Sequence, residues 1–150
     1  MHACAAAGAG FQVAVLWFDL MFDVQVRRHA GPVLPADTLA SIAAYYRRVT
    51  TQASPMGRLI TVVMALTVLC IAVQIARRSA PWWIAWPSLA AALTGIGLAV
   101  ARTVRNAVRL GRAADDPETQ TRLARSIWRD HLICLAAMTT VLTLQLAAGV

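Results

Sequence analysis

Residues 57–76 read GRLITVVMALTVLCIAVQIA, and residues 82–101 read WWIAWPSLAAALTGIGLAVA. Both stretches are almost entirely apolar, and Arg58 is the single charged residue in either of them. An α-helix of about 20 apolar residues is long enough to cross the hydrocarbon core of a bilayer, which is about 30 Å thick. The two stretches therefore predict two transmembrane helices joined by a short turn at 77–81.

Two further apolar stretches, residues 5–26 and 131–149, lie on either side of this pair. The 150-residue chain is 59% hydrophobic and 14% charged, whereas about a quarter of the residues of a soluble domain are charged. We therefore predict a single all-α domain, an integral membrane four-helix bundle. The first span is the least apolar of the four because it contains Asp19 and Asp23.

The arginines of the chain lie mostly on one side of the predicted membrane. Two of them, Arg77 and Arg78, lie in the turn between spans two and three. The other twelve lie in or beside the two long loops: Arg27, Arg28, Arg47, Arg48, Arg58, Arg102, Arg105, Arg109, Arg112, Arg122, Arg125 and Arg129. Because arginine-rich loops stay in the cytoplasm, we predict a multi-pass protein of the inner (plasma) membrane with both termini outside.

The net charge of +7 comes with 14 basic residues, all of them arginine. Since they lie between apolar runs, we predict the lipid bilayer and its anionic headgroups as partners, and no nucleic acid. In span three, Ala91, Gly95 and Ala99 recur every four residues, a spacing that lets another helix approach closely. This spacing favours tight packing within the bundle over a dimer contact, and it leaves a homo- or hetero-oligomer open.

The first long loop contains a helical pattern. Residues 36–52 follow Pro35, and their larger apolar side chains fall near one helix face: Leu39, Ile42, Tyr46 and Val49. We predict a short cytoplasmic amphipathic helix that lies on the membrane surface between spans one and two.

The second long loop predicts two helix segments separated by a turn. The arginines at 102, 105, 109 and 112 share one face of a helix that continues past span three. We expect Gly111 and the turn at 115–118 to end it. Asp116 is a suitable N-cap and Pro117 a suitable first residue for a helix that runs unbroken into span four.

Several charged residues are expected near the inner face. Asp19 and Asp23 are four residues apart, so they share one face of the first span. Ionisable residues inside spans face the bundle interior and commonly mark proton, ion or substrate sites. The predicted topology brings them to a level with Arg58, Arg102 and His131, beside Asp130. These five residues, Asp19, Asp23, His131, Arg58 and Arg102, are the candidate catalytic residues; a structural ion pair to an arginine is the alternative.

The glutamines, cysteines and histidines of the chain indicate no further catalytic or metal site. Gln12, Gln74 and Gln145 fall in the outer halves of three spans and predict interhelical hydrogen bonds. The cysteines at 4, 70 and 134 have no metal-ligand spacing, and we expect no disulfide among them. The three histidines predict no metal site, and the sequence specifies no cofactor.

A family resemblance is carried by three short motifs. They are Tyr45-Tyr46-Arg47-Arg48 after the surface helix, Ser54-Pro55-Met56 before span two, and Trp128-x-x-His131 at the start of span four. With them, the chain resembles the small four-span membrane family that includes the fungal anthrone oxygenases and many bacterial proteins. The resemblance covers most of the chain, but the Asp19/Asp23 pair has no match in the family pattern. It implies oxidation of aromatic compounds by O₂ without an evident cofactor.

Two classes of function remain open at this point. In the first, the chain is a small membrane oxidoreductase of the oxygenase type that takes a small hydrophobic molecule from the cytoplasmic leaflet. Asp19 would then be the general base, His131 would assist proton transfer, and Arg58 or Arg102 would stabilise an anionic intermediate. In the second, the chain is a non-catalytic accessory or transport-type subunit, and the two aspartates are structural or relay a proton.

Overall fold

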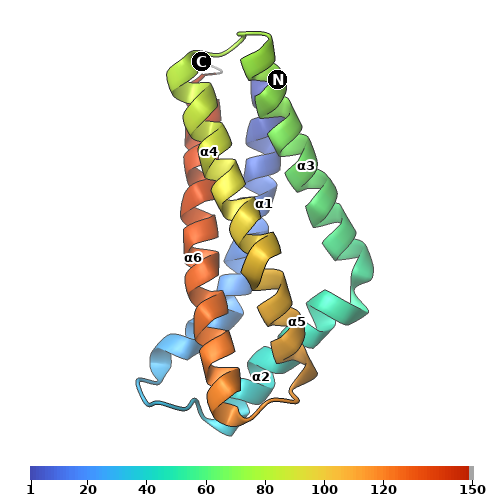
Figure 1. Cartoon of the computed structure of the whole chain (residues 1–150), viewed down its shortest axis with the longest axis vertical. Helices are drawn as coiled ribbons and strands as arrows, with labels where there is room; N and C mark the ends of the chain where they lie inside the picture. Colours follow the sequence, from blue (N-terminus) through green and yellow to red (C-terminus); the bar gives the residue numbers. More distant parts are fainter. Residues whose placement is uncertain (149–150) are drawn as a thin grey trace.

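The computed structural model describes residues 1–148, and these residues form helices and no strands (Figure 1). The α-helices are α1 (His2–Asp23), α2 (Ala36–Arg47), α3 (Ser54–Ala76), α4 (Trp82–Leu98), α5 (Val104–Arg112) and α6 (Pro117–Ala147). A 3₁₀ turn at Val24–Arg28 extends α1, and π-helical turns at Arg48–Gln52 and Ala99–Thr103 follow α2 and α4. The all-helical prediction is confirmed.

Four helical segments are long and apolar enough to cross a membrane: His2–Arg28, Pro55–Ala76, Trp82–Arg112 and Pro117–Ala147. The first three contain the predicted spans, and the fourth contains the last predicted span as far as Ala147; residue 148 is a turn and residue 149 lies outside the described residues. As predicted, α6 begins at the N-cap Asp116, whose carboxylate accepts a hydrogen bond of 2.9 Å from the Thr119 amide, and it runs unbroken to Ala147.

The long helices form a ring in which each packs against two neighbours. α1 lies between α3 and α6, and α4 lies between the same two helices. α4 and α5 form one continuous rod through the π-helical turn, and α2 crosses the end of the bundle beside α5 (Figure 1). The N-terminus and the end of α6 lie together at the opposite end of the bundle (Figure 1).

Two apolar cores fill this bundle. The terminal core lies toward the N-terminus and consists of Ala5, Ala9, Cys70, Ile71, Ala92, Met138 and Val141. The loop core lies toward α2 and consists of Val26, Leu34, Leu39, Ile42, Tyr46, Ala107, Leu110, Leu123, Ala124 and Ile127. On α6, the buried Asp130 and His131 lie between Ile127 of the loop core and Met138 of the terminal core.

The helix predicted at 36–52 is present, as α2 and the π-helical turn after it. Its surroundings differ from the prediction, because its apolar face packs against α5 and α6 and does not face outward. Leu39 and Ile42 are buried there. The ends of α5 and α6 offer apolar side chains that bury this face.

α5 ends at Arg112, between Gly111 and the turn at 115–118 that were expected to end it, and the chain turns at Ala113, whose φ is 50°. Gly111 also allows α2 to approach α5 closely, because a Cβ there would lie 2.8 Å from the backbone nitrogen of Arg47. In span three, a Cβ on Gly95 would lie 2.9 Å from the Met138 side chain of α6, which fits the predicted packing within the bundle.

Cys4 and Cys70 form a disulfide between α1 and α3, so the prediction of no disulfide is wrong. The two residues are 66 positions apart, and only the packing of α1 against α3 brings them together. Cys134 is free and buried.

Candidate functional site

The central feature is a buried carboxylate–imidazole pair between α1 and α6. Oδ2 of Asp23 lies 2.6 Å from Nδ1 of His131, and Oδ1 of the same carboxylate accepts a 2.6 Å hydrogen bond from the Tyr46 hydroxyl. Asp23 is 1% exposed. Both carboxylate oxygens therefore have a partner, which a carboxylate out of contact with water requires.

Asp19 lies one helical turn before Asp23 and nearer the surface. Its Oδ1 accepts a 2.6 Å hydrogen bond from the Tyr45 hydroxyl, and its side chain is 18% exposed. Oδ2 of Asp19 is 3.9 Å from Nε2 of His131, beyond direct hydrogen-bonding distance. The imidazole thus lies between the two carboxylates, bonded through Nδ1 to one and facing the other with Nε2.

Two adjacent tyrosines of α2 complete the cluster. Burial raises the pKa of Tyr46 well above its usual value, and the carboxylates of Asp23 and Asp19 raise it further. Burial and then Asp19 likewise raise the pKa of Tyr45. Both phenols therefore stay protonated and donate at physiological pH. The Tyr45 ring also stacks on Phe22, with 4.0 Å between centroids, which holds α2 against α1.

Arg102 pairs with Asp130 and not with the α1 carboxylates. Its Nε donates to Oδ2 of Asp130 over 3.0 Å, and Nη2 donates to Oδ1. The Thr103 hydroxyl donates to the same carboxylate over 3.1 Å. Asp130 is fully buried, whereas the Arg102 side chain is 51% exposed, so the arginine extends from the surface to neutralise an interior charge.

The predicted layer of charged residues therefore divides. The structure brings together Asp19, Asp23 and His131, while Arg102 belongs to the separate pair with Asp130. Arg58 is exposed near the start of α3, and no hydrogen bond or ion pair joins it to the described residues. Neither arginine contacts the cluster, so a structural ion pair between an arginine and Asp19 or Asp23 is not formed among these residues.

Tyr45 and Tyr46 were missed as site residues. The sequence pattern placed Tyr46 on the apolar face of α2 and included both in a family motif, but nothing indicated their partners. The first span has two acidic residues on one face, and the next helix has two adjacent tyrosines. This pattern indicates carboxylate–phenol hydrogen bonds only when α1 and α2 are known to pack together.

The predicted amide layer forms in part. Gln74 donates to the side-chain oxygen of Gln145 over 2.9 Å, and Gln145 donates to the Ser88 hydroxyl over 3.0 Å. Nδ1 of His2 lies 3.1 Å from the same oxygen of Gln145. Gln12 does not join them, because it contacts Thr67 instead, at 3.5 Å. The two joined glutamines tie α3 to α6 near the termini.

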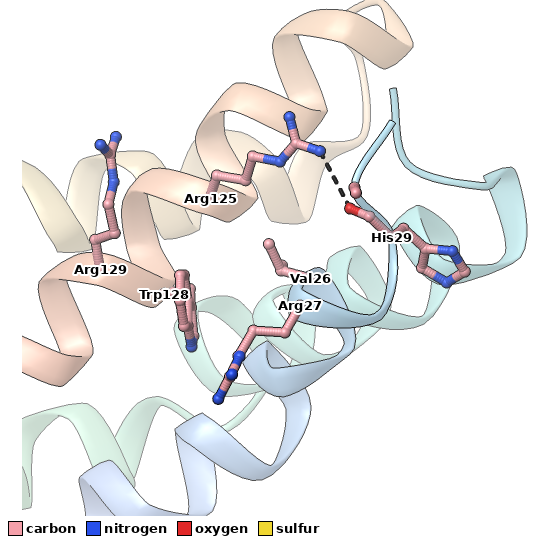
Figure 2. A pocket seen from close by; sticks show the side chains of 7 residues that line it. Val26, Arg27, His29, Arg125, Trp128 and Arg129 are labelled. Atoms are coloured by element: carbon pink, nitrogen blue, oxygen red, sulfur yellow. Dashed lines mark hydrogen bonds between the residues drawn. The ribbon is translucent and has the colours of Figure 1, made fainter. Parts of the chain in front are cut away.

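A shallow hollow of about 360 Å³, which Asp19, Asp23 and His131 do not line, lies beside the loop core (Figure 2). It is lined by Val26, Arg27, His29, Ala30, Arg125, Trp128 and Arg129. Among the described residues, no group of three or more histidine, cysteine or acidic side chains is placed to hold a metal ion.

The chain matches no protein-family model, no curated protein and no solved structure.

Proposed function

We propose that the chain is an integral membrane protein that crosses the bilayer with α1, α3, the α4–α5 rod and α6. Large apolar side chains on the outside of these helices support this proposal. Six of them are more than half exposed: Trp17, Phe18, Val62, Leu69, Leu93 and Leu146. A water-soluble monomer rarely exposes so much contiguous apolar surface, whereas lipid chains would cover it at no cost.

The proposed orientation places α2 and α5 at the cytoplasmic face of an inner membrane. Twelve of the 14 arginines lie in or beside the loops at that end. The disulfide between Cys4 and Cys70 lies toward the opposite end, near the N-terminus, and disulfides persist on the oxidising outer side of such membranes. Arginine distribution and disulfide position therefore favour the same orientation.

Within that frame, we propose that the cluster of Asp19, Asp23 and His131 is an acid–base site. The observation that carries this proposal is the 2.6 Å contact between Asp23 and Nδ1 of His131. With Asp23 ionised, Nδ1 donates to it, and Nε2 of the neutral imidazole, 3.9 Å from Oδ2 of Asp19, can accept a proton. Asp19 is the partly exposed member, so it is the group that an incoming molecule would reach.

The proposed activity is that of a small membrane enzyme of the oxidoreductase or oxygenase type, acting on a hydrophobic substrate near the cytoplasmic leaflet. Asp19 would take a proton from an acidic O–H or C–H of the substrate, and His131 would accept it onward. Tyr45 would orient Asp19 through its 2.6 Å hydrogen bond. The resemblance to anthrone oxygenases makes anthrones and quinols the first compounds to test. Arg58 and Arg102 have no role in this proposal, since Arg102 pairs with Asp130 and Arg58 does not contact the cluster.

The test compares Asp19→Asn and His131→Ala with the parent protein in detergent, following thermal unfolding and the O₂ uptake that accompanies oxidation of an added anthrone or quinol. We expect both variants to lose activity by about 100-fold or more, the usual contribution of a positioned acid or base. Asp19→Asn should fold normally, whereas His131→Ala should also lose some thermal stability, because Asp23 loses a buried partner. Asp37→Asn, an exposed carboxylate on α2, is the matched control and should keep full activity. A parent protein that oxidises neither compound would overturn the proposed activity.

A non-catalytic accessory or transport-type subunit is the second candidate. It is favoured by the complete pairing of Asp23, and by the position of the Figure 2 hollow, which Asp19, Asp23 and His131 do not line. Here the carboxylates would fix the bundle or pass a proton between α1 and α6. A large loss of thermal stability in both variants would favour the structural role, and proton flux into vesicles that stops in Asp19→Asn would favour the relay.

A further inference from the structure

The hollow in Figure 2 has strongly positive walls. Three arginines line it, from the 3₁₀ turn after α1 and from α6, and no acidic residue does. Arg125 is held in place by the loop opposite, since it donates to backbone carbonyls of His29, Gly31 and Pro32. Arg27 and Arg129 are exposed and make no hydrogen bond or ion pair with the described residues. Two guanidinium groups are therefore available to an anionic ligand at this hollow.

Apart from His29, the rest of the lining is apolar. Val26 is buried against the loop core, and the indole of Trp128 stands in the hollow between the side chains of Arg27 and Arg129 (Figure 2). One helical turn further along the bundle, Val24 follows on from the α1 side and Leu132 from the α6 side. They are 39% and 41% exposed, so the apolar surface continues from the hollow along the outside of the proposed spans.

We propose that this hollow binds the phosphate-bearing headgroup of an anionic phospholipid of the cytoplasmic leaflet. Arg27 and Arg129 donate to the phosphate oxygens, a contact that a planar guanidinium makes with two parallel hydrogen bonds. Trp128 lies at the level of the glycerol backbone, where indoles are favoured, and the acyl chains follow Val24 and Leu132. A free phosphate ion would leave this apolar surface uncovered, so a lipid is the ligand to which the chemistry points.

The inference rests on the proposed membrane insertion, which alkaline carbonate extraction tests separately. The binding test titrates detergent-purified protein with dioleoyl phosphatidylglycerol and counts bound lipid by native mass spectrometry. Parallel titrations use dioleoyl phosphatidylcholine and inorganic phosphate. We expect phosphatidylglycerol to bind at least tenfold more tightly than the other two compounds, since each arginine near a surface contributes roughly a few-fold in affinity for anionic lipid. Equal binding of all three, or tighter binding of inorganic phosphate, would overturn the proposal.

Two variants locate the site. Arg27→Gln/Arg129→Gln should weaken phosphatidylglycerol binding by about tenfold or more. Arg105→Gln/Arg112→Gln removes the same charge from exposed arginines of the proposed cytoplasmic face that lie outside the hollow, so it should bind like the parent. Ala30→Trp fills the hollow without changing charge, and it should abolish binding. It tests the same site independently if the double arginine variant fails to fold. Equal losses in the hollow and control pairs, or normal binding by Ala30→Trp, would show that only diffuse charge attracts the lipid.

Discussion

At the scale of single residues, the Tyr46 phenol makes a pH-dependent contribution to stability that can be measured. It is buried, donates to Asp23, and has a pKa raised well above its usual value by burial and the nearby carboxylates. The unfolded chain loses this proton near pH 10, while the folded chain keeps it. The contribution of Tyr46 to the free energy of unfolding should therefore be constant below pH 10 and fall by about 1.4 kcal/mol per pH unit above it. Tyr45, whose pKa is also raised, adds a similar fall in the parent.

The measurement is thermal unfolding in detergent between pH 8 and 11, with Tyr46→Phe beside the parent. The variant should be less stable at pH 8, because Asp23 loses a buried donor, yet its stability should fall less steeply above pH 10. The chain has no lysine, so the other groups that titrate in this range are Tyr45, the free thiol of Cys134 and the N-terminal amine. Subtracting the curve of Tyr46→Phe from that of the parent removes their contribution. Tyr45→Phe/Tyr46→Phe should be flatter still. Parallel curves for parent and variants would contradict the assignment.

At the scale of elements, the crossing of α2 over α5 positions both tyrosines. Gly111 makes this crossing possible, because a Cβ there would lie 2.8 Å and 3.0 Å from the backbone nitrogen and Cα of Arg47. Backbone atoms cannot move aside as the end of a flexible side chain can, so Gly111→Ala should push α2 and α5 apart. We expect a loss of roughly 1–3 kcal/mol in stability, measured by thermal unfolding.

Gly97→Ala is the control for that substitution. Nothing lies within 4 Å of a Cβ at Gly97, so this change should stabilise α4 by up to about 1 kcal/mol through helix propensity alone. Gly111→Ala should also weaken the proposed acid–base site, since α2 carries the donors to Asp19 and Asp23. Equal stability of the two variants would mean that α2 packs less tightly against α5 than the backbone contacts indicate.

These elements also mark how far the sequence could predict the molecule. Span lengths, the helix at 36–52 and the N-cap at Asp116 are local properties of hydropathy and capping, and the structure has all of them. Contacts between distant helices depend on which faces meet, and no periodicity encodes that. The disulfide of Cys4 and Cys70 and the bonds from the α2 tyrosines are therefore visible only in three dimensions.

At the scale of the whole molecule, the proposed orientation connects the arginine loops, the disulfide and the lipid hollow. In this orientation, α2 and α5 lie inside the cell and the 77–81 turn lies outside. Ser79 and Ala114 are exposed residues at the two ends of the bundle, so cysteines there report the side directly. The parent is a fair background, because Cys4 and Cys70 are bonded and Cys134 is buried.

We expect a membrane-impermeant maleimide to label Ser79→Cys in intact cells, and to label Ala114→Cys only after the membrane is permeabilised. The physical reason is that the loop next to Ala114 joins two arginine-rich helix ends, which resist transfer across the membrane. The parent should remain unlabelled in both conditions. Labelling of Ala114→Cys from outside would invert the bundle, and it would place the Arg27–Arg129 hollow against the outer leaflet and Asp19 near the outer surface.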